Sequence, residues 1–221
     1  MDNAQILRHV DHTLLKAASS WEEIKLLCEE AVAYQTASVC VPSSYVERIF
    51  RSYGQKLPIC TVVGFPLGYA VTEAKVAEAK VAILAGACEI DMVINIGDVK
   101  NGEFQKTEKE LLALRKATEG SVLKVIIETC YLTEAEKIEL CRLVSACGAD
   151  YIKTSTGFGT AGATLADILL FKKHIEQHVK IKAAGGIRSK EDMVAYLEAG
   201  CDRLGTSSAI KILKGEATAG Y

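Results

Sequence analysis

The chain has 221 residues, of which 49% are apolar and 24% charged, and its 28 acidic and 26 basic residues give a formal net charge of −2. This length suits one domain, and the balanced charge excludes the basic surface typical of proteins that bind nucleic acid or anionic membranes. The apolar runs fall far short of the ~20 residues that span a membrane, and residues 1–16 carry charges where a signal peptide has an apolar stretch. We therefore expect a cytoplasmic protein with no membrane or nucleic-acid partner.

The eight cysteines are scattered and form neither a Cys-x-x-Cys pair nor a set with histidine at metal-ligand spacing. Cys40 and Cys141 lie inside apolar patterns. We interpret the cysteines as reduced core residues and predict no metal site.

Short segments rich in Val, Ile and Thr alternate along the chain with longer segments of helical periodicity. Strands are predicted over residues 10–15, 37–41, 59–64, 89–96, 122–129, 151–155, 180–184 and 202–206. Ser20 and Thr133 are each followed three residues later by Glu, which predicts a capping box at the start of two helices, and Gly148 predicts the end of the second. Further helices are predicted near the N-terminus and over residues 71–87, 106–118, 165–174 and 190–199.

Eight strand–helix alternations without a break in composition indicate an α/β protein with a parallel sheet in one domain, residues 1–221. An open doubly wound sheet of this size more often has about five or six strands, whereas eight strands close a (β/α)8 TIM barrel. We therefore predict a single (β/α)8 barrel with a short N-terminal helix. About the last six residues are expected to form a mobile tail.

Charged residues interrupt four of the predicted strands, although strands of a parallel barrel are normally apolar on both faces. In strand 89–96 the even positions are apolar, so the two-residue period directs Asp91 to the barrel interior. The same period directs Lys124, Lys153 and Lys182 inward. Any one of these lysines alone is equally well explained as a strand-end residue that reaches solvent. Together they predict a functional cluster of mixed charge.

Lys153 and Lys182 lie on strands that should be neighbours, so their amino groups are expected side by side. A second ammonium nearby and partial loss of solvent lower the pKa of a lysine and expose the neutral, nucleophilic amine that forms a Schiff base. One lysine would then be the nucleophile and the other the cation that activates it. Asp91 would transfer protons.

Glycine-rich loops follow the last three predicted strands, where barrel enzymes commonly bind phosphate. Backbone N–H groups of glycine can approach an anion closely, although left-handed turn conformations explain a glycine pair about equally well. The candidate phosphate ligands are Gly157, Gly185, Gly186, Gly205, Ser207 and Ser208, and Arg188 is a weaker candidate.

These residues belong to motifs that resemble the deoxyribose-phosphate aldolase family over nearly the whole chain. The matching segments are residues 11–15, 63–68, 89–97, 124–129, 153–158, 182–188 and 205–208. The resemblance implies a class I aldolase that needs no cofactor and reversibly cleaves 2-deoxy-D-ribose 5-phosphate to D-glyceraldehyde 3-phosphate and acetaldehyde. It also implies that Lys153 is the Schiff-base nucleophile, Lys182 the neighbouring ammonium and Asp91 the acid/base. Lys124 would belong to the same charge network.

The resemblance further implies a homodimer and a second role for the C-terminus. In some relatives a terminal tyrosine reaches the site as a proton shuttle, so Tyr221 is a candidate for this role, with an ordinary disordered end as the alternative. Cys40 is a candidate for lining the site, although a core position is the simpler interpretation. Two other functions remain open: a different Schiff-base barrel aldolase of the transaldolase or keto-acid type, and a non-catalytic sugar-phosphate binding protein.

Overall fold

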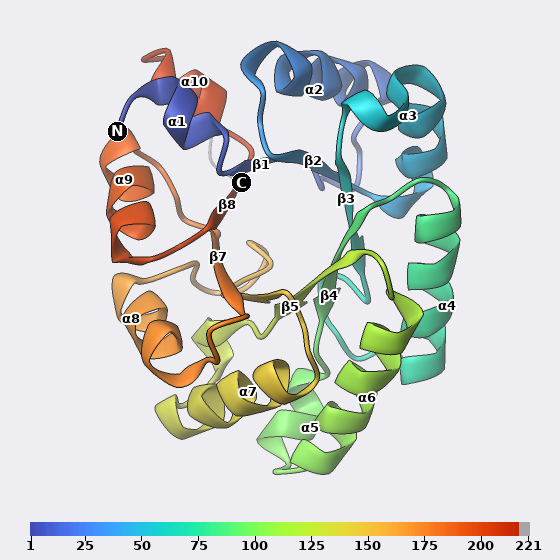
Figure 1. Cartoon of the computed structure of the whole chain (residues 1–221), viewed down its shortest axis with the longest axis vertical. Coiled ribbons are helices and arrows are strands. Elements are labelled where there is room, and N and C mark those ends of the chain that lie inside the picture. Colours follow the sequence, from blue (N-terminus) through green and yellow to red (C-terminus); the bar gives the residue numbers. More distant parts are fainter. Residues whose placement is uncertain (217–221) are drawn as a thin grey trace.

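A computed structural model of the chain describes residues 1–216, and these residues contain a closed barrel of eight parallel strands in the order β1 to β8 (Figure 1). The strands are β1 (Val10–Thr13), β2 (Ser38–Val41), β3 (Ile59–Val63), β4 (Glu89–Val93), β5 (Val122–Ile126), β6 (Tyr151–Lys153), β7 (Lys180–Ala184) and β8 (Arg203–Thr206). Each strand pairs with its sequence neighbours, and β8 closes the ring by pairing with β1. The predicted (β/α)8 fold is confirmed.

Helices surround the barrel as an outer ring (Figure 1). The main helices are α2 (Trp21–Tyr34), α3 (Val46–Tyr53), α4 (Thr72–Leu84), α6 (Phe104–Ala117), α7 (Glu134–Ala146), α8 (Leu165–His174), α9 (Lys190–Ala199) and α10 (Ala209–Leu213). The expected short N-terminal helix is α1 (Asn3–Leu7), and α5 (Ile96–Lys100) is a further short helix between β4 and α6. No helix within residues 1–216 is long and apolar enough to cross a membrane.

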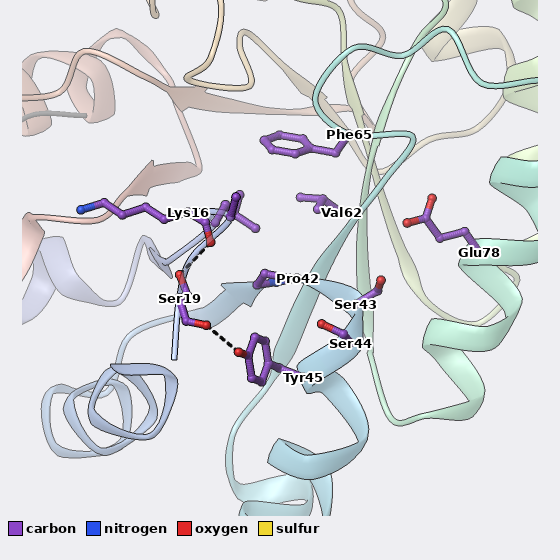
Figure 2. A pocket seen from close by; sticks show the side chains of 11 residues that line it. Lys16, Ser19, Pro42, Ser43, Ser44, Tyr45, Val62, Phe65 and Glu78 are labelled. Atoms are coloured by element: carbon purple, nitrogen blue, oxygen red, sulfur yellow. Dashed lines mark hydrogen bonds between the residues drawn. The ribbon is translucent and has the colours of Figure 1, made fainter. Parts of the chain in front are cut away.

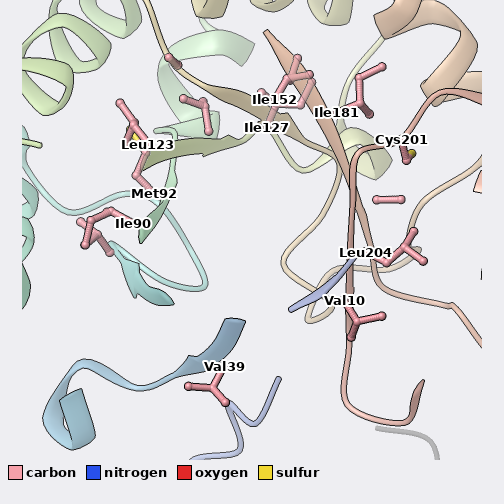
Figure 3. Close-up of a cluster of buried hydrophobic side chains, with 14 of the residues drawn as sticks. Val10, Val39, Ile90, Met92, Leu123, Ile127, Ile152, Ile181, Cys201 and Leu204 are labelled. Atoms are coloured by element: carbon pink, nitrogen blue, oxygen red, sulfur yellow. The ribbon is translucent and has the colours of Figure 1, made fainter. Parts of the chain in front are cut away.

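The strands divide their side chains between two environments, as the two-residue period requires. Alternate residues point outward and pack beneath the helices, and Figure 3 shows this apolar layer with Val39, Ile90, Ile152 and Leu204 among its members. The other residues point into the barrel, where a smaller apolar cluster of Leu15, Cys40, Cys60 and Val62 adjoins a group of charged side chains. The charges therefore lie inside the barrel.

The caps of two helices confirm the capping-box predictions. Ser20 accepts a hydrogen bond from the backbone N–H of Glu23, and Thr133 does the same for Glu136. Helix α7 ends at Ala146, and Gly148 follows with a positive φ of 73°. All eight cysteines are free thiols; six are buried, whereas Cys88 is exposed and Cys130 half-buried.

Several predicted boundaries were wrong. Strands β4, β5 and β6 end at Val93, Ile126 and Lys153, three, three and two residues before the predicted ends at 96, 129 and 155. In β4 the cause is Asn95, whose side chain caps α5. The helices predicted over 71–87 and 106–118 span residues 72–84 and 104–117, and neither α3 nor α5 was predicted. The remaining elements match within two residues.

A buried ion pair fixes the carboxyl end of β4 to the surrounding helices. Lys75 Nζ lies 2.7 Å from Glu110 Oε1 and donates a hydrogen bond of 2.8 Å to the backbone oxygen of Val93. Glu110 Oε2 accepts a hydrogen bond of 3.2 Å from the backbone N–H of Asn95. Burial lowers the pKa of Lys75 and raises that of Glu110, so each depends on the other to remain charged.

We expect Lys75→Met to lower the free energy of unfolding by about 3–5 kcal/mol, because it leaves the Glu110 carboxylate buried without its cation. The double variant Lys75→Met/Glu110→Gln should lose much less than the sum of the two single changes. Urea unfolding of the three variants measures this coupling. The exposed pair of Arg51 and Glu47 is the control, since Arg51→Ala should cost less than about 1 kcal/mol. Equal stability of Lys75→Met and the unchanged protein would contradict the role assigned to this pair.

Candidate active site

The carboxylate of Asp91 lies at the centre of the charged cluster inside the barrel. Its Oδ2 atom accepts hydrogen bonds from Lys153 Nζ at 2.8 Å and from Lys182 Nζ at 2.7 Å. Its Oδ1 atom accepts from Lys124 Nζ at 2.8 Å and from the Cys60 thiol at 3.1 Å. Asp91 therefore connects all three interior lysines that the sequence predicted.

Three further charged residues extend the cluster toward the amino ends of the strands. Asp11 accepts hydrogen bonds from Lys182 and Arg203, and Arg203 Nη1 also lies 3.0 Å from Glu89 Oε2. Lys124 Nζ lies 2.6 Å from the same Glu89 oxygen. The cluster thus combines four cations, Lys124, Lys153, Lys182 and Arg203, with three carboxylates, Asp11, Glu89 and Asp91.

The contacts keep most of these groups ionised despite their burial. Burial alone would raise the pKa of Asp91, but the three surrounding ammonium groups lower it far below its usual value. Burial likewise opposes the ionisation of Asp11, and the neighbouring lysines and Arg203 lower its pKa. Burial alone would lower the pKa of Lys182, but Asp11 and Asp91 raise it above the ordinary range, and carboxylates have the same effect on Lys124.

The strand register explains why these side chains meet. Asp91 pairs with Lys124 across β4 and β5, and Lys153 pairs directly with Lys182 across β6 and β7. Residues at the same level of neighbouring strands and on the same face have adjacent side chains. The expectation that the two lysine side chains are neighbours is confirmed by their contact with one carboxylate oxygen.

Lys153 differs from the other two interior lysines in its surroundings. Within residues 1–216 its amino group contacts one carboxylate, whereas that of Lys182 contacts two and that of Lys124 three. The side chain of Lys153 is 3% exposed, whereas Lys124 and Lys182 are fully buried. Lys153 thus contacts the fewest carboxylates of the three lysines and is the one with any exposed surface.

Asp11, Glu89 and Arg203 were missed as members of the cluster, although Asp11 and Glu89 lie in the recognised motifs. The signal that could have found them is the two-residue period, because Glu89 shares the parity of Asp91 and Arg203 shares that of Gly205. Asp11 pairs with Gly205 across β1 and β8, which places it on the interior face as well.

The structure brings three of the candidate phosphate glycines together. Gly157, Gly185 and Gly186 have positive φ angles of 87°, 79° and 73°. A Cβ atom on Gly185 would lie 3.4 Å from the Cα atom of Gly157, so the loops after β6 and β7 are in contact. These positive φ angles fit both interpretations of the glycines, because residues in a left-handed turn can also direct their backbone N–H groups toward an anion.

The other candidates lie in or after β8. Gly205 is a strand residue, and a Cβ atom there would lie 3.1 Å from Lys182 Cε, so this glycine makes room for the lysine side chain. Ser207 and Ser208 follow the strand, and the N–H of Ser208 donates to Thr206 Oγ1 at 3.2 Å. Arg188 is exposed, and its backbone N–H donates to Asp192 at 3.0 Å. Tyr221 and residues 217–220 of the expected tail lie outside the described residues.

A cavity of 340 Å³ opens at the carboxyl ends of β1 to β3, and Figure 2 shows the side chains that line it. Leu15 and Val62 line it and also pack against the buried Cys40 and Cys60, whose thiols lie on the interior face. Phe65 at the rim packs edge-to-face on Phe158, with ring centroids 5.3 Å apart. Cys40 is therefore one layer of side chains away from this cavity and belongs to the barrel interior.

Among residues 1–216, two groups of side chains bring possible metal ligands within 4.8 Å of one another: Cys40, Cys60 and Asp91, and Asp11, Cys60 and Glu89. The carboxylates in both groups already bind protein ammonium or guanidinium groups. Burial, the hydrogen bond with Cys40 and the neighbouring Asp91 raise the pKa of Cys60, which disfavours the thiolate that a metal needs. A cation would therefore have to displace a lysine to bind.

Comparison with known proteins agrees with this geometry. Residues 6–210 match the model of the DeoC/LacD family aldolases. The chain is 61% identical over 221 residues, all of both chains, to deoxyribose-phosphate aldolase of Clostridium botulinum strain Alaska E43, and 57% identical to that of Clostridioides difficile over 98% of this chain and 99% of the relative. A tetrameric deoxyribose phosphate aldolase from Aeropyrum pernix superposes with a TM-score of 0.90 at 31% identity, covering 97% of this chain and 92% of that one. The chain therefore belongs to the DeoC/LacD family of aldolases.

Proposed function

We propose that this enzyme reversibly cleaves 2-deoxy-D-ribose 5-phosphate to D-glyceraldehyde 3-phosphate and acetaldehyde through a Schiff base on Lys153. The observation that carries the proposal is the contact of Lys153 and Lys182 with one oxygen of Asp91. A sugar-phosphate binding protein has no need of a buried lysine pair around a carboxylate, whereas Schiff-base chemistry needs a neutral amine beside groups that move protons.

The charge of the cluster favours Lys153 as the nucleophile. Four cations face three carboxylates, so the loss of one proton balances the cluster. Lys182 remains the charged partner because Asp11 and Asp91 raise its pKa. The neutral Lys153 amine attacks the aldehyde carbon C1 of the open-chain sugar, and loss of water leaves a protonated imine.

Cleavage then breaks the bond between C2 and C3, because acetaldehyde takes C1 and C2 of the sugar. A base removes the proton of the C3 hydroxyl, C3 becomes the aldehyde carbon of glyceraldehyde 3-phosphate, and the electrons of the broken bond flow into the imine to give an enamine. Protonation at C2 and addition of water release acetaldehyde and regenerate the amine. Asp91 and Lys182 are the groups proposed to exchange these protons, through water where the distance requires it.

The phosphate group is proposed to bind at the loops after β6, β7 and β8. The positive φ angles of Gly157, Gly185 and Gly186 support backbone N–H groups as its ligands, and Ser207 and Ser208 add hydroxyl groups in the next loop. The contribution of Gly205 would be indirect, through the space it provides for Lys182.

We also propose three further properties: one domain over residues 1–221, a cytoplasmic location and a homodimeric state. The relative from Aeropyrum pernix is a tetramer, so a measured mass is needed to establish the assembly. Tyr221 stays a candidate proton shuttle, and its deletion should slow hydrogen exchange at the methyl group of acetaldehyde.

The experiment that tests the function is reductive trapping. Incubation with acetaldehyde and borohydride should leave a covalent adduct on Lys153, identified by peptide mapping, and 2-deoxyribose 5-phosphate should give an adduct on the same lysine. Omission of the aldehyde is the control. An adduct that forms only with a ketone or keto-acid donor would instead identify another Schiff-base aldolase, and no adduct at all would exclude lysine catalysis.

A further inference from the structure

Glu128 is a buried carboxylate that lies near the active site but outside the Asp91 cluster. It follows β5, and its backbone has φ 53° and ψ 68°, in the left-handed region that glutamate rarely adopts. Such a conformation is unfavourable for a residue other than glycine and persists only where the surroundings enforce it. The residue is 2% exposed, so the strained backbone delivers a carboxylate into the protein interior.

This carboxylate binds the loop that follows β6. Both of its oxygens accept the backbone N–H of Thr156 at 3.2 Å, and Oε2 also accepts the Thr156 hydroxyl at 2.5 Å. Thr156 Oγ1 in turn accepts the backbone N–H of Phe158 at 3.0 Å. The Glu128 side chain, which follows β5, therefore holds residues 156–158 of the loop after β6 in place.

The same loop is packed against Glu128 at its far end. A Cβ atom on Gly159 would lie 2.9 Å from Cys130 Sγ and 3.1 Å from both Cδ and Oε1 of Glu128, so the loop packs closely against both side chains. Between these two attachment points lies Gly157, with φ 87° and in contact with the Gly185 loop. The orientation of the N–H at Gly157 therefore depends on the carboxylate beneath it.

We propose that Glu128 is a positioning residue, which holds residues 156–159 in the conformation that binds the phosphate group of the substrate. This inference rests on the proposed function. Glu128 acts through the loop and not on the reacting carbon atoms, because its carboxylate accepts hydrogen bonds from Thr156 and from the neighbouring Cys130 thiol. Burial raises the pKa of this carboxyl, although the hydrogen bonds from Thr156 and the positive charge of Lys153 act in the opposite direction.

If Glu128 positions this loop, its removal should weaken the binding of a phosphorylated sugar much more than that of an unphosphorylated one. We expect Glu128→Ala to raise the KM for 2-deoxyribose 5-phosphate roughly ten-fold or more, because the loop loses charged hydrogen bonds. The KM for unphosphorylated 2-deoxyribose should change less than about two-fold, because this sugar has no phosphate group for the loop to bind. Glu128→Gln keeps an acceptor for the Thr156 N–H and should restore most of the affinity. Thr156→Val, which removes the bonded hydroxyl, should show the same dependence on phosphate in weaker form.

The measurement is kcat and KM for both sugars, with thermal unfolding to establish that each variant folds. The exposed Glu119 provides the matched control, since Glu119→Ala should leave both reactions unchanged. A parallel loss with both sugars, or unchanged kinetics with both in Glu128→Ala and Thr156→Val, would overturn the positioning role while the proposed function stands. If the unchanged protein cleaves neither sugar, the proposed function itself fails.

Discussion

Replacing Lys153 by methionine is expected to lower kcat on the order of 10⁴-fold or more, because it removes the proposed Schiff-base nucleophile. The fold should tolerate the change. Without Lys153 the cluster has three cations and three carboxylates, so the free energy of unfolding should not fall as it does when one member of a balanced pair is removed. Turnover, borohydride trapping and urea unfolding measure the three consequences.

Two variants of β7 test whether loss of the trapped adduct is specific to substitution of Lys153. Lys182→Met should lower turnover by about 10²–10⁴-fold, the range of a lost proton-transfer group, yet leave the trapped adduct on Lys153. Lys180 lies two residues before Lys182 and is exposed at the start of the same strand, so Lys180→Met should change neither quantity. An adduct that persists in Lys153→Met would show that another lysine is the nucleophile.

The interior charges could be predicted from the sequence because the two-residue period is unambiguous where apolar residues mark one face. In β4, Ile90 and Met92 face the helices, so Asp91 must face the barrel axis. The same argument is weak for β1, where Asp11 and His12 are both polar and adjacent. His12 points outward and contacts Glu30 of α2 at 2.8 Å, which only the tertiary structure reveals.

Strand ends were harder to predict because hydrophobicity does not stop where the hydrogen-bonded ladder stops. Ile94 is buried beyond the end of β4, so the sequence reads as a longer strand. The actual end depends on Asn95, whose backbone N–H is bound by Glu110 from a distant helix. At β5 the chain turns at Glu128, a residue type that does not signal a positive φ, and its contacts with Thr156 come from 28 residues further along the chain.

Some glycine roles can be predicted from the local sequence, whereas others depend on tertiary contacts. Turn residues such as Gly157 and Gly185 are recognisable because they follow strands in glycine-rich runs. Gly205 has the same appearance in sequence, yet it lies within β8 and its missing side chain accommodates Lys182. The sequence therefore locates the loops proposed to bind phosphate but does not distinguish a proposed ligand from a residue that creates space for a neighbouring side chain.

Replacing Asp91 by asparagine is expected to lower both stability and activity. The change leaves three lysines around a neutral amide, because Lys124, Lys153 and Lys182 all contact this carboxylate. Removal of one member of a buried ion pair costs about 3–5 kcal/mol, and loss of a general acid/base lowers turnover about 10²–10⁴-fold. Urea unfolding and kcat at neutral pH test both effects, with Asp202→Asn, at an exposed carboxylate, as the control.

The pH dependence of unfolding tests whether the stability lost in Asp91→Asn comes from the charge of this carboxylate. Because the pKa of Asp91 is lower in the folded than in the unfolded state, its stabilisation is complete above the unfolded value of 3.8 and is lost as the pH falls toward the folded value. Asp11 contributes in the same direction. The unchanged protein should therefore lose stability as the pH falls below about 5, and Asp91→Asn should lose less over this interval because one of the two carboxylates has gone. Parallel acid profiles for the two proteins would mean that Asp91 is not stabilised by its lysines, and the charge balance that favours Lys153 as the nucleophile would lose its physical basis.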